Sequence, residues 1–298
     1  MDAAKAGLIK LFLTLCARLP LSWARAIGRG IGYLAWPLGG RNRKVTERNI
    51  ELAFPELSSA ERRTLARRSL IATSELAAEM GHVWLRDWDY VRDLVVAVEG
   101  QEQITEALAE GRGVIVLAPH LGNWEMIGLH LPSLGSVVSL YEPPHIRALE
   151  PIIRGARERS GATLVPTDAR GLARLLKSVK GGNISGILPD QAPGDVNSGE
   201  NSPFMGVPSF TGTLAVNMIR RTGALAVFGF AKRIPGGFHL YYLPADAGVY
   251  DEDTHVALAA MNRGVEGCVR YCEEQYQWEY KRFRVRPAKG PGVYDSLK

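Results

Sequence analysis

The segment Gly113-Val-Ile-Val-Leu-Ala-Pro-His-Leu-Gly-Asn-Trp-Glu125 decides the fold class of this chain. Its apolar run at 114–118 predicts a buried strand of the kind found in parallel sheets, and the proline after it ends the strand. Gly122-Asn123 predicts a turn that starts a helix at Trp124. His120 is therefore expected at the carboxyl end of a strand, where open α/β sheets bind their ligands.

The same segment carries a candidate acid–base pair, because Glu125 follows His120 by five residues. An imidazole titrates near neutrality and can act as a general base. A nearby carboxylate can hold the imidazole in one tautomer and raise its basicity, so His120 and Glu125 are the candidate catalytic residues. The spacing alone equally allows a loop histidine beside an unrelated carboxylate at a helix start.

The rest of the chain alternates between strand and helix patterns. Short apolar runs predict strands at 95–98, 136–141, 163–166, 184–188, 224–233 and 238–243. Amphipathic patterns predict helices at 58–86, 101–110, 146–159, 171–179, 211–221 and 254–277, the first opened by a capping box at Ser58 to Glu61. This order predicts an α/β fold with a mostly parallel sheet flanked by helices on both sides.

The N-terminal segment is expected to be a helical hairpin that is separate in role from the remainder. Apolar residues recur at helical spacing from Leu8 to Leu19 and again from Trp23 to Leu34, and Pro20 separates the two runs. We therefore divide the chain into membrane-associating helices at 1–40 and a catalytic domain at 41–298. A pair of core-packing helices gives the same pattern and stays open.

Two details of this segment limit the alternatives. No run of 18 or more mainly apolar residues exists, and the apolar stretch continues past any signal-peptidase site, so neither a membrane span nor a secretory signal is expected. The glycines of Gly28-Arg29-Gly30-Ile31-Gly32 are too closely spaced for a dinucleotide fingerprint and predict close helix packing instead.

Composition excludes several classes of protein. The 298 residues contain three cysteines, which predicts a reducing compartment without a disulfide framework. Cys268 and Cys272 lack a histidine-rich partner segment, and no nucleotide-binding motif is present, so we expect no metal and no cofactor. The net charge of +5 suits an anionic partner, but the basic clusters lack any pattern of nucleic-acid recognition, so no nucleic acid is expected.

Five further motifs follow in order along the chain. They are Arg48-Asn49 with Phe54-Pro55-Glu56-Leu57; Tyr141-Glu142-Pro143-Pro144 with Arg157-Glu158-Arg159; Pro189-Asp190-Gln191 with Pro193-Gly194; Phe204-Met205-Gly206-Val207-Pro208; and Glu274-Gln275-Tyr276-Gln277-Trp278 with Lys281-Arg282-Phe283 and Arg286-Pro287. Together with His120-Leu-Gly-Asn-Trp-Glu125 they resemble the lauroyl/myristoyl late acyltransferases of lipid A biosynthesis, within the glycerolipid acyltransferase-like superfamily. Tyr280 and Glu142 depart from that family's usual histidine and arginine.

This resemblance implies the reaction and the partners. A fatty acyl chain would pass from an acyl carrier protein or acyl-CoA thioester to a hydroxyl of a phosphorylated glycolipid acceptor, a lipid A precursor. His120 would be the general base and Glu125 would orient it. The enzyme would work on the membrane surface at the cytoplasmic face of the bacterial inner membrane. Another lipid acceptor, a thioesterase activity and a non-catalytic lipid-binding protein remain alternatives, although the intact His120 and Glu125 argue against the last.

Other motif residues are candidates for substrate binding. Arg157 and Arg159 are placed on the phosphate of the acceptor by the resemblance, because guanidinium groups recognise phosphate bidentately. A solvated helix end would explain the same pair. Asp190 and Gln191 follow a predicted strand and are candidates for acceptor contacts, and a simple turn aspartate is the alternative.

The remaining candidates concern the acyl donor. The side chain of Asn123, with the backbone amides after His120, is a candidate donor to the oxyanion. Trp124 and Phe204 are candidates for the acyl-chain pocket, and core packing would explain Phe204 equally well.

Overall fold

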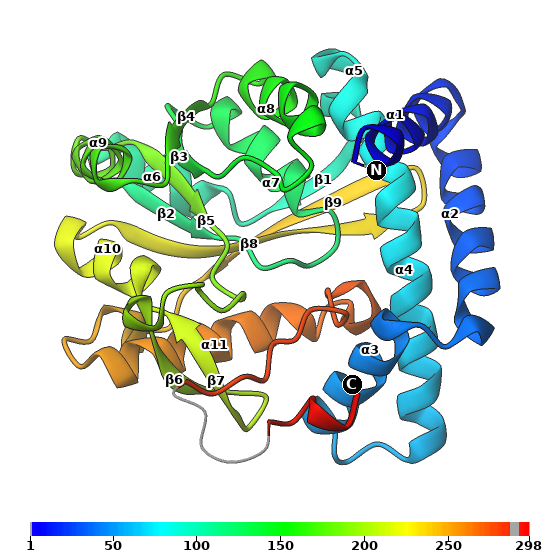
Figure 1. Ribbon diagram of the computed structural model, residues 1–298. Coiled ribbons are helices and arrows are strands. Elements are labelled where there is room, and N and C mark those ends of the chain that lie inside the picture. Colours follow the sequence, from blue (N-terminus) through cyan, green and yellow to red (C-terminus); the bar gives the residue numbers. More distant parts are fainter. Residues whose placement is uncertain (1, 287–291, 298) are drawn as a thin grey trace.

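A sheet of five strands, in the order β1-β9-β8-β2-β5, runs through the centre of the computed structural model (Figure 1). Residues 2–286 and 292–297 are described, so Pro287 of the last motif lies outside the described residues. The strands are β1 Val95–Glu99, β2 Val114–Leu117, β3 Val138–Tyr141, β4 Thr163–Pro166, β5 Ile184–Ile187, β6 Gly199–Phe204, β7 Val207–Gly212, β8 Leu225–Ile234 and β9 Gly237–Pro244.

The sheet is largely parallel around β2. This strand pairs in parallel with β5 on one side and with β8 on the other, while β8 and β9 form the antiparallel hairpin expected around Pro235-Gly236. Strands β3 and β4 form a parallel ribbon beside β5, joined to it by a bridge between Val137 and Ile184. The predicted α/β class is thus confirmed.

Helices cover both faces of the sheet (Figure 1). They are α1 Asp2–Arg18, α2 Leu21–Ala35, α3 Arg41–Ala53, α4 Ser59–Leu85, α5 Trp88–Asp93, α6 Glu102–Ala109, α7 Trp124–His130, α8 Glu150–Arg159, α9 Ala169–Lys180, α10 Leu214–Thr222 and α11 Thr254–Val269, with short 3-10 turns between several of them. The capping box predicted for α4 is present, with Ser58 and Glu61 bonded reciprocally.

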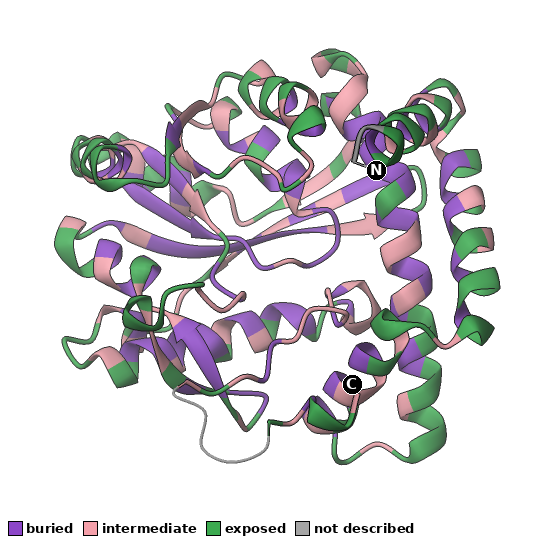
Figure 2. Ribbon diagram, viewed as in Figure 1, coloured by how far each residue is buried: buried purple, intermediate pink, exposed green. Residues whose placement is uncertain are grey.

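The two faces of β2 explain why its apolar run is unbroken. Val114 and Val116 pack into the core under α6 and α7, whereas Ile115 and Leu117 pack into the core under α10 and α11. All four side chains are fully buried, as Figure 2 shows for the central strands. A strand buried on both faces carries apolar residues without alternation.

Helix α2 packs closely on α4 through its glycines. A Cβ atom at Gly28 would lie 2.6 Å from the Ser74 carbonyl oxygen, and one at Gly32 would lie 2.8 Å from the Ile71 Cα. A Cβ atom at Gly30 would meet nothing within 4 Å. The expected close helix packing is therefore confirmed at Gly28 and Gly32.

The apolar stripe of the N-terminal hairpin points away from the protein. Among the described residues, the five most exposed large apolar side chains are Leu38, Leu34, Leu8, Leu11 and Trp23, at 66–82% exposure. The buried side of α2 instead carries small residues and Arg25. No helix within residues 2–286 or 292–297 is long and apolar enough to cross a bilayer.

Three parts of the fold differ from the sequence-based expectation. Helix α11 ends at Val269, not near 277, and the following residues wrap as a turn-rich strap against the loop after β2. The helix predicted at 211–221 starts only at Leu214, because residues 207–212 pair with β6 in a hairpin. Helix α3 was not predicted.

Candidate active site

His120 and Asp190 form a hydrogen-bonded pair at the carboxyl ends of neighbouring strands. The His120 Nδ1 atom lies 2.8 Å from Asp190 Oδ1, and the His120 backbone N–H donates to Asp190 Oδ2 at 2.9 Å. The Asp190 side chain is 2% exposed and that of His120 is 13% exposed. One carboxylate thus fixes both the main chain and the ring of the histidine.

Strand register explains why these two residues meet. Leu117 of β2 pairs with Ile187 of β5, and His120 and Asp190 each stand three residues beyond that pair, after a proline. Equal extensions from the ends of parallel neighbours arrive at the same point. Two strands that both end in an x-Pro-polar sequence are therefore the signal that would have predicted this pair from sequence.

The surroundings keep Asp190 ionised. Burial alone would raise its pKa, but the charge of His120, the two hydrogen bonds from that residue and the charge of Arg282 together lower the pKa below its ordinary value. An ionised carboxylate only accepts hydrogen bonds, so His120 Nδ1 carries the proton and Nε2 is the free acceptor.

The turn after His120 requires a glycine. Gly122 has a φ of +60°, and a Cβ atom there would lie 1.9 Å from the Ala231 carbonyl oxygen. Its N–H donates to the Gln275 carbonyl at 3.0 Å, and the Gln277 N–H donates to the His120 carbonyl at 3.0 Å. The strap after α11 thus holds the turn that carries His120 from outside.

Glu125 does not hold His120, which corrects the role expected for it. Its two carboxylate oxygens accept a bidentate pair of hydrogen bonds from Arg157, at 2.9 and 2.5 Å. Glu125 is 4% exposed at its side chain and Arg157 is 33% exposed. Burial would lower the pKa of Arg157, but the charge of Glu125 and its hydrogen bonds raise it. The pair joins α7 to α8.

Arg159 also has protein partners instead of an open position. Its guanidinium donates to the backbone carbonyls of Arg86 and Val83, at the end of α4. It therefore caps the last turn of that helix. The helix-end interpretation describes Arg159, and the two arginines do not form a free phosphate fork.

Two further candidates, Asn123 and Gln191, are hydrogen-bonded to other residues of the protein. The Asn123 amide donates to Glu79 at 3.2 Å, and its N–H donates to the Ala231 carbonyl. The Gln191 amide donates to Gln277 at 2.9 Å. The four consecutive backbone amides at 120–123 also have acceptors, so none of them is a free oxyanion donor in this conformation.

A narrow apolar pocket begins beside the histidine. The ring of Trp124 lies against that of His120, with centroids 4.8 Å apart. Trp124, Glu125 and Arg157 line the pocket together with apolar residues of α7, β3 and β5. Its volume is about 80 Å³, the space of roughly three water molecules. Phe204 is not among its walls: this side chain is fully buried against Phe283 and Arg282 in the core.

Trp278 and Arg282 of the last motif are buried and bonded to the protein's own backbone and side chains. The buried Arg282 donates to Phe210, Thr211 and Asn262, and the Trp278 indole donates to the Glu273 carbonyl at 2.7 Å. Next to them, Glu279 accepts from Thr73 at 3.2 Å, and burial raises the pKa of the Glu279 carboxyl despite the charge of His120 nearby. Sequence analysis had not singled out Glu279.

Among the residues that the structure describes, no group of three or more histidine, cysteine or acidic side chains has the arrangement of a metal site. The three cysteines are buried and free. The chemistry available at this position is therefore that of an oriented imidazole, an ionised carboxylate and a partly buried arginine–glutamate pair beside an apolar pocket.

The fold and this site define an α/β protein with a histidine held by a carboxylate, and comparison with known proteins gives its class as an O-acyltransferase. The chain belongs to the bacterial lipid A biosynthesis acyltransferase family, whose description matches residues 4–285. It is 29% identical to the lipid A biosynthesis lauroyltransferase of Escherichia coli K12, over 95% of this chain and 92% of the relative. The palmitoleoyltransferase and myristoyltransferase of the same organism are 27% and 25% identical, covering 95% and 90% of this chain and 92% and 82% of the relatives.

Proposed function

We propose that this enzyme transfers a fatty acyl chain from an acyl carrier protein or acyl-CoA thioester to a hydroxyl of a lipid A precursor, with His120 as general base. The observation that carries the proposal is the His120–Asp190 pair, because it leaves Nε2 unprotonated and able to accept a proton. Family membership supports the acyl and lipid A parts of the proposal.

The reaction needs no nucleophile from the protein. The acceptor hydroxyl attacks the thioester carbonyl carbon while His120 Nε2 takes its proton, and Asp190 stabilises the imidazolium that forms. The tetrahedral intermediate then expels the thiolate, which takes the proton back from His120. The ester bond forms, the carbon–sulfur bond breaks, and the histidine returns to its first state.

The apolar pocket next to His120 is proposed as the entrance for the acyl chain. Its walls are apolar except for Glu125, Arg157 and Ser139. A volume of about 80 Å³ is smaller than a long acyl chain, so entry of the chain requires side chains such as Trp124 to move aside. We assign the Glu125–Arg157 pair the role of fixing the distance between α7 and α8 along this pocket.

The N-terminal hairpin is proposed as the membrane-associating part of the chain, residues 1–40, with residues 41–298 as the acyltransferase domain. Large apolar side chains exposed on both helices are costly in water and are buried when the helices lie in a bilayer interface. The net charge of +5 favours an anionic surface, such as the cytoplasmic face of the bacterial inner membrane.

The proposal is tested with purified protein, an acyl thioester and a lipid A precursor. Acyl carrier protein and CoA thioesters are supplied separately, and the acylated lipid is measured by mass spectrometry. Wild type should form the ester, and thioester loss should depend on the acceptor. Equal thioester loss without acceptor would instead indicate a thioesterase.

A further inference from the structure

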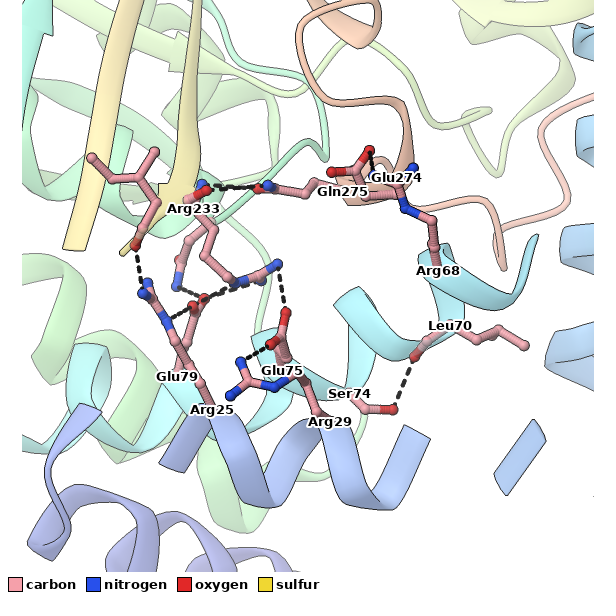
Figure 3. Close-up of polar contacts among 12 residues, drawn as sticks. Arg25, Arg29, Arg68, Leu70, Ser74, Glu75, Glu79, Arg233, Glu274 and Gln275 are labelled. Carbon is pink, nitrogen blue, oxygen red and sulfur yellow. Dashed lines mark hydrogen bonds and ion pairs between the residues drawn. The ribbon is translucent and has the colours of Figure 1, made fainter. Parts of the chain in front are cut away.

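A second cavity, of about 730 Å³, lies away from His120, between α2, α4 and the turn after β8. Four arginines from three separate segments line it, namely Arg25 and Arg29 of α2, Arg68 of α4 and Arg233 of β8 (Figure 3). Apolar walls from Leu21 and Ile71 complete it. A cavity with cationic and apolar walls suits an amphipathic anion.

Two of these arginines form a fixed wall. The fully buried Glu79 accepts from Arg25 Nε at 2.6 Å and from Arg233 Nε at 2.5 Å. Arg25 also donates to the carbonyls of Ile234 and Gly237, at the β8–β9 turn. These contacts occupy most N–H donors of the Arg25 and Arg233 guanidinium groups. The two arginines therefore shape the cavity but have few donors left for a ligand.

The other two arginines are open. Arg29 pairs with Glu75 through Nη1 at 2.6 Å, and Arg68 pairs with Glu274 through Nη2 at 3.4 Å. Their side chains are 45% and 62% exposed. Each uses one nitrogen for its ion pair, which leaves further N–H groups of each planar fork for an incoming anion. Four guanidinium groups against the carboxylates of Glu75, Glu79 and Glu274 leave an excess of positive charge.

The cavity opens to the surface on one side and adjoins the turn that carries His120 on the other. Tyr33, half-exposed on α2, and Arg68, 62% exposed on α4, both belong to its lining, so the cavity opens to the surface. Behind its wall, Glu79 accepts from Asn123, and the Gln275 carbonyl accepts from Gly122. A lipid whose polar head enters here from the surface would stand beside the turn that carries His120.

We propose that this cavity binds an anionic phosphate group of a membrane lipid, with Arg29 and Arg68 as the binding side chains. The phosphate belongs either to the phosphorylated acceptor or to an anionic phospholipid of the bilayer. A phosphate monoester offers more acceptor oxygens and more charge than the carboxylate of Glu274, and a phosphodiester can be held by the open N–H groups of Arg29 and Arg68 together. The assignment to the acceptor rests on the proposed function, whereas binding of a phospholipid does not.

The test uses the full-length Arg29→Gln/Arg68→Gln protein, with Arg62→Gln/Arg63→Gln as the matched control. Arg62 and Arg63 stand on the same α4 helix, outside this cavity, and their replacement removes the same charge. A third protein, Arg29→Lys/Arg68→Lys, keeps the charge but loses the planar fork. Thermal unfolding of each variant verifies that the fold is kept.

Binding is measured first in a His120→Ala background, so the result does not depend on catalysis. The vesicles are phosphatidylcholine alone, or phosphatidylcholine with phosphatidylglycerol, with a phosphorylated lipid A precursor or with its dephosphorylated form. Kinetics with both precursors follow in the active protein. The glutamine pair should weaken affinity for a phosphate-bearing lipid by roughly tenfold or more, and the lysine pair should recover part of it.

The pattern over the vesicles identifies the source of the phosphate. A loss confined to the phosphorylated precursor, seen as a higher KM with little change in kcat, assigns the site to the acceptor. A loss on phosphatidylglycerol vesicles, equal for both precursors, assigns it to the bilayer. A loss no greater than that of the Arg62→Gln/Arg63→Gln control, or equal on phosphatidylcholine alone, would overturn the proposal.

Discussion

The two oxygens of Asp190 have separate tasks in orienting His120. Oδ2 accepts from the backbone N–H, which cannot change its role, and Oδ1 accepts from the ring. This division dictates the tautomer, because the ring nitrogen facing a carboxylate oxygen must carry the proton. An amide at this position would have only one acceptor oxygen, so it could accept from the backbone N–H or from the ring N–H, but not from both.

Asp190→Asn should therefore inactivate the enzyme almost without affecting its fold. The amide oxygen would face the backbone N–H and the amide nitrogen would face Nδ1, which places the ring proton on Nε2 and removes the base. The expected loss in kcat is roughly 10²–10⁴-fold. Steady-state kinetics measures it, with Glu125→Gln as the comparison. A smaller loss for Asp190→Asn than for Glu125→Gln would contradict the assignment of the pair.

Sequence reasoning located His120 and placed Asp190 at a strand end, yet it paired His120 with Glu125. The five-residue spacing suggested proximity along the chain, but α7 turns Glu125 toward Arg157 of α8. Partners such as Arg157 and Glu79 depend on how distant helices dock, and no local pattern encodes that docking. The equal extension beyond the paired residues Leu117 and Ile187 is local information and would have sufficed.

At the scale of elements, the contact between α2 and α4 depends on residues without side chains. Gly28 and Gly32 bring the two backbones together, and Arg25 then reaches Glu79 and the β8–β9 turn. Helices such as α2 and α4 could be predicted from the periodic spacing of their apolar residues. The end of α11 was not, because the apolar spacing continues into a strap whose Tyr276 bridges to Leu121.

Substituting the glycines of α2 separates packing from helix propensity. Gly28→Ala should destabilise the protein by about 1–3 kcal/mol, because its Cβ atom would press on the Ser74 backbone. Gly30→Ala should stabilise it by about 0.5–1 kcal/mol, because the position is helical and open. Urea unfolding of the two variants and wild type gives both values. The same sign for both substitutions would refute the close α2–α4 contact.

At the scale of the whole molecule, the hairpin is both a wall of the protein and its proposed attachment to the bilayer. Truncation of the first 38 residues would remove Arg25 and leave the fully buried Glu79 with one fewer partner. Detachment from membranes after truncation would thus be ambiguous. Substitutions on the exposed face alone avoid this difficulty.

Replacing Leu11, Leu15 and Leu34 together with glutamine should release the protein from vesicles and leave its thermal unfolding unchanged. Each leucine is more than half exposed, and full burial of one in a bilayer contributes about 1.5–3 kcal/mol. Vesicle co-sedimentation in low and high salt measures the effect. Release of wild type by salt alone would show that charge, not apolar insertion, holds the protein there.

Acid should weaken the contact between the hairpin and the domain through Glu79. Burial alone would raise the pKa of Glu79, but Arg233 and Arg25 lower it below its ordinary value. A lowered folded pKa gives stability that is complete above the unfolded value of about 4.3 and is lost as pH falls through the folded value.

Glu79→Gln should accordingly destabilise the protein by roughly 3–5 kcal/mol at about pH 7, because it breaks a buried pair. Its difference from wild type should shrink at about pH 3.5. Urea unfolding at both pH values supplies the comparison. A difference that stays constant with pH would mean that Glu79 is not the group whose charge stabilises this contact.

The most direct test of the central claim is mass spectrometry of lipid A from cells that lack the gene and carry it back on a plasmid. Lipid A from the deletion strain should lack one acyl chain, and the wild-type gene should restore that chain. His120→Ala, present at equal abundance, should not restore it, because loss of the base costs roughly 10²–10⁴-fold in rate. Full restoration by His120→Ala, or lipid A that does not change on deletion, would contradict the account.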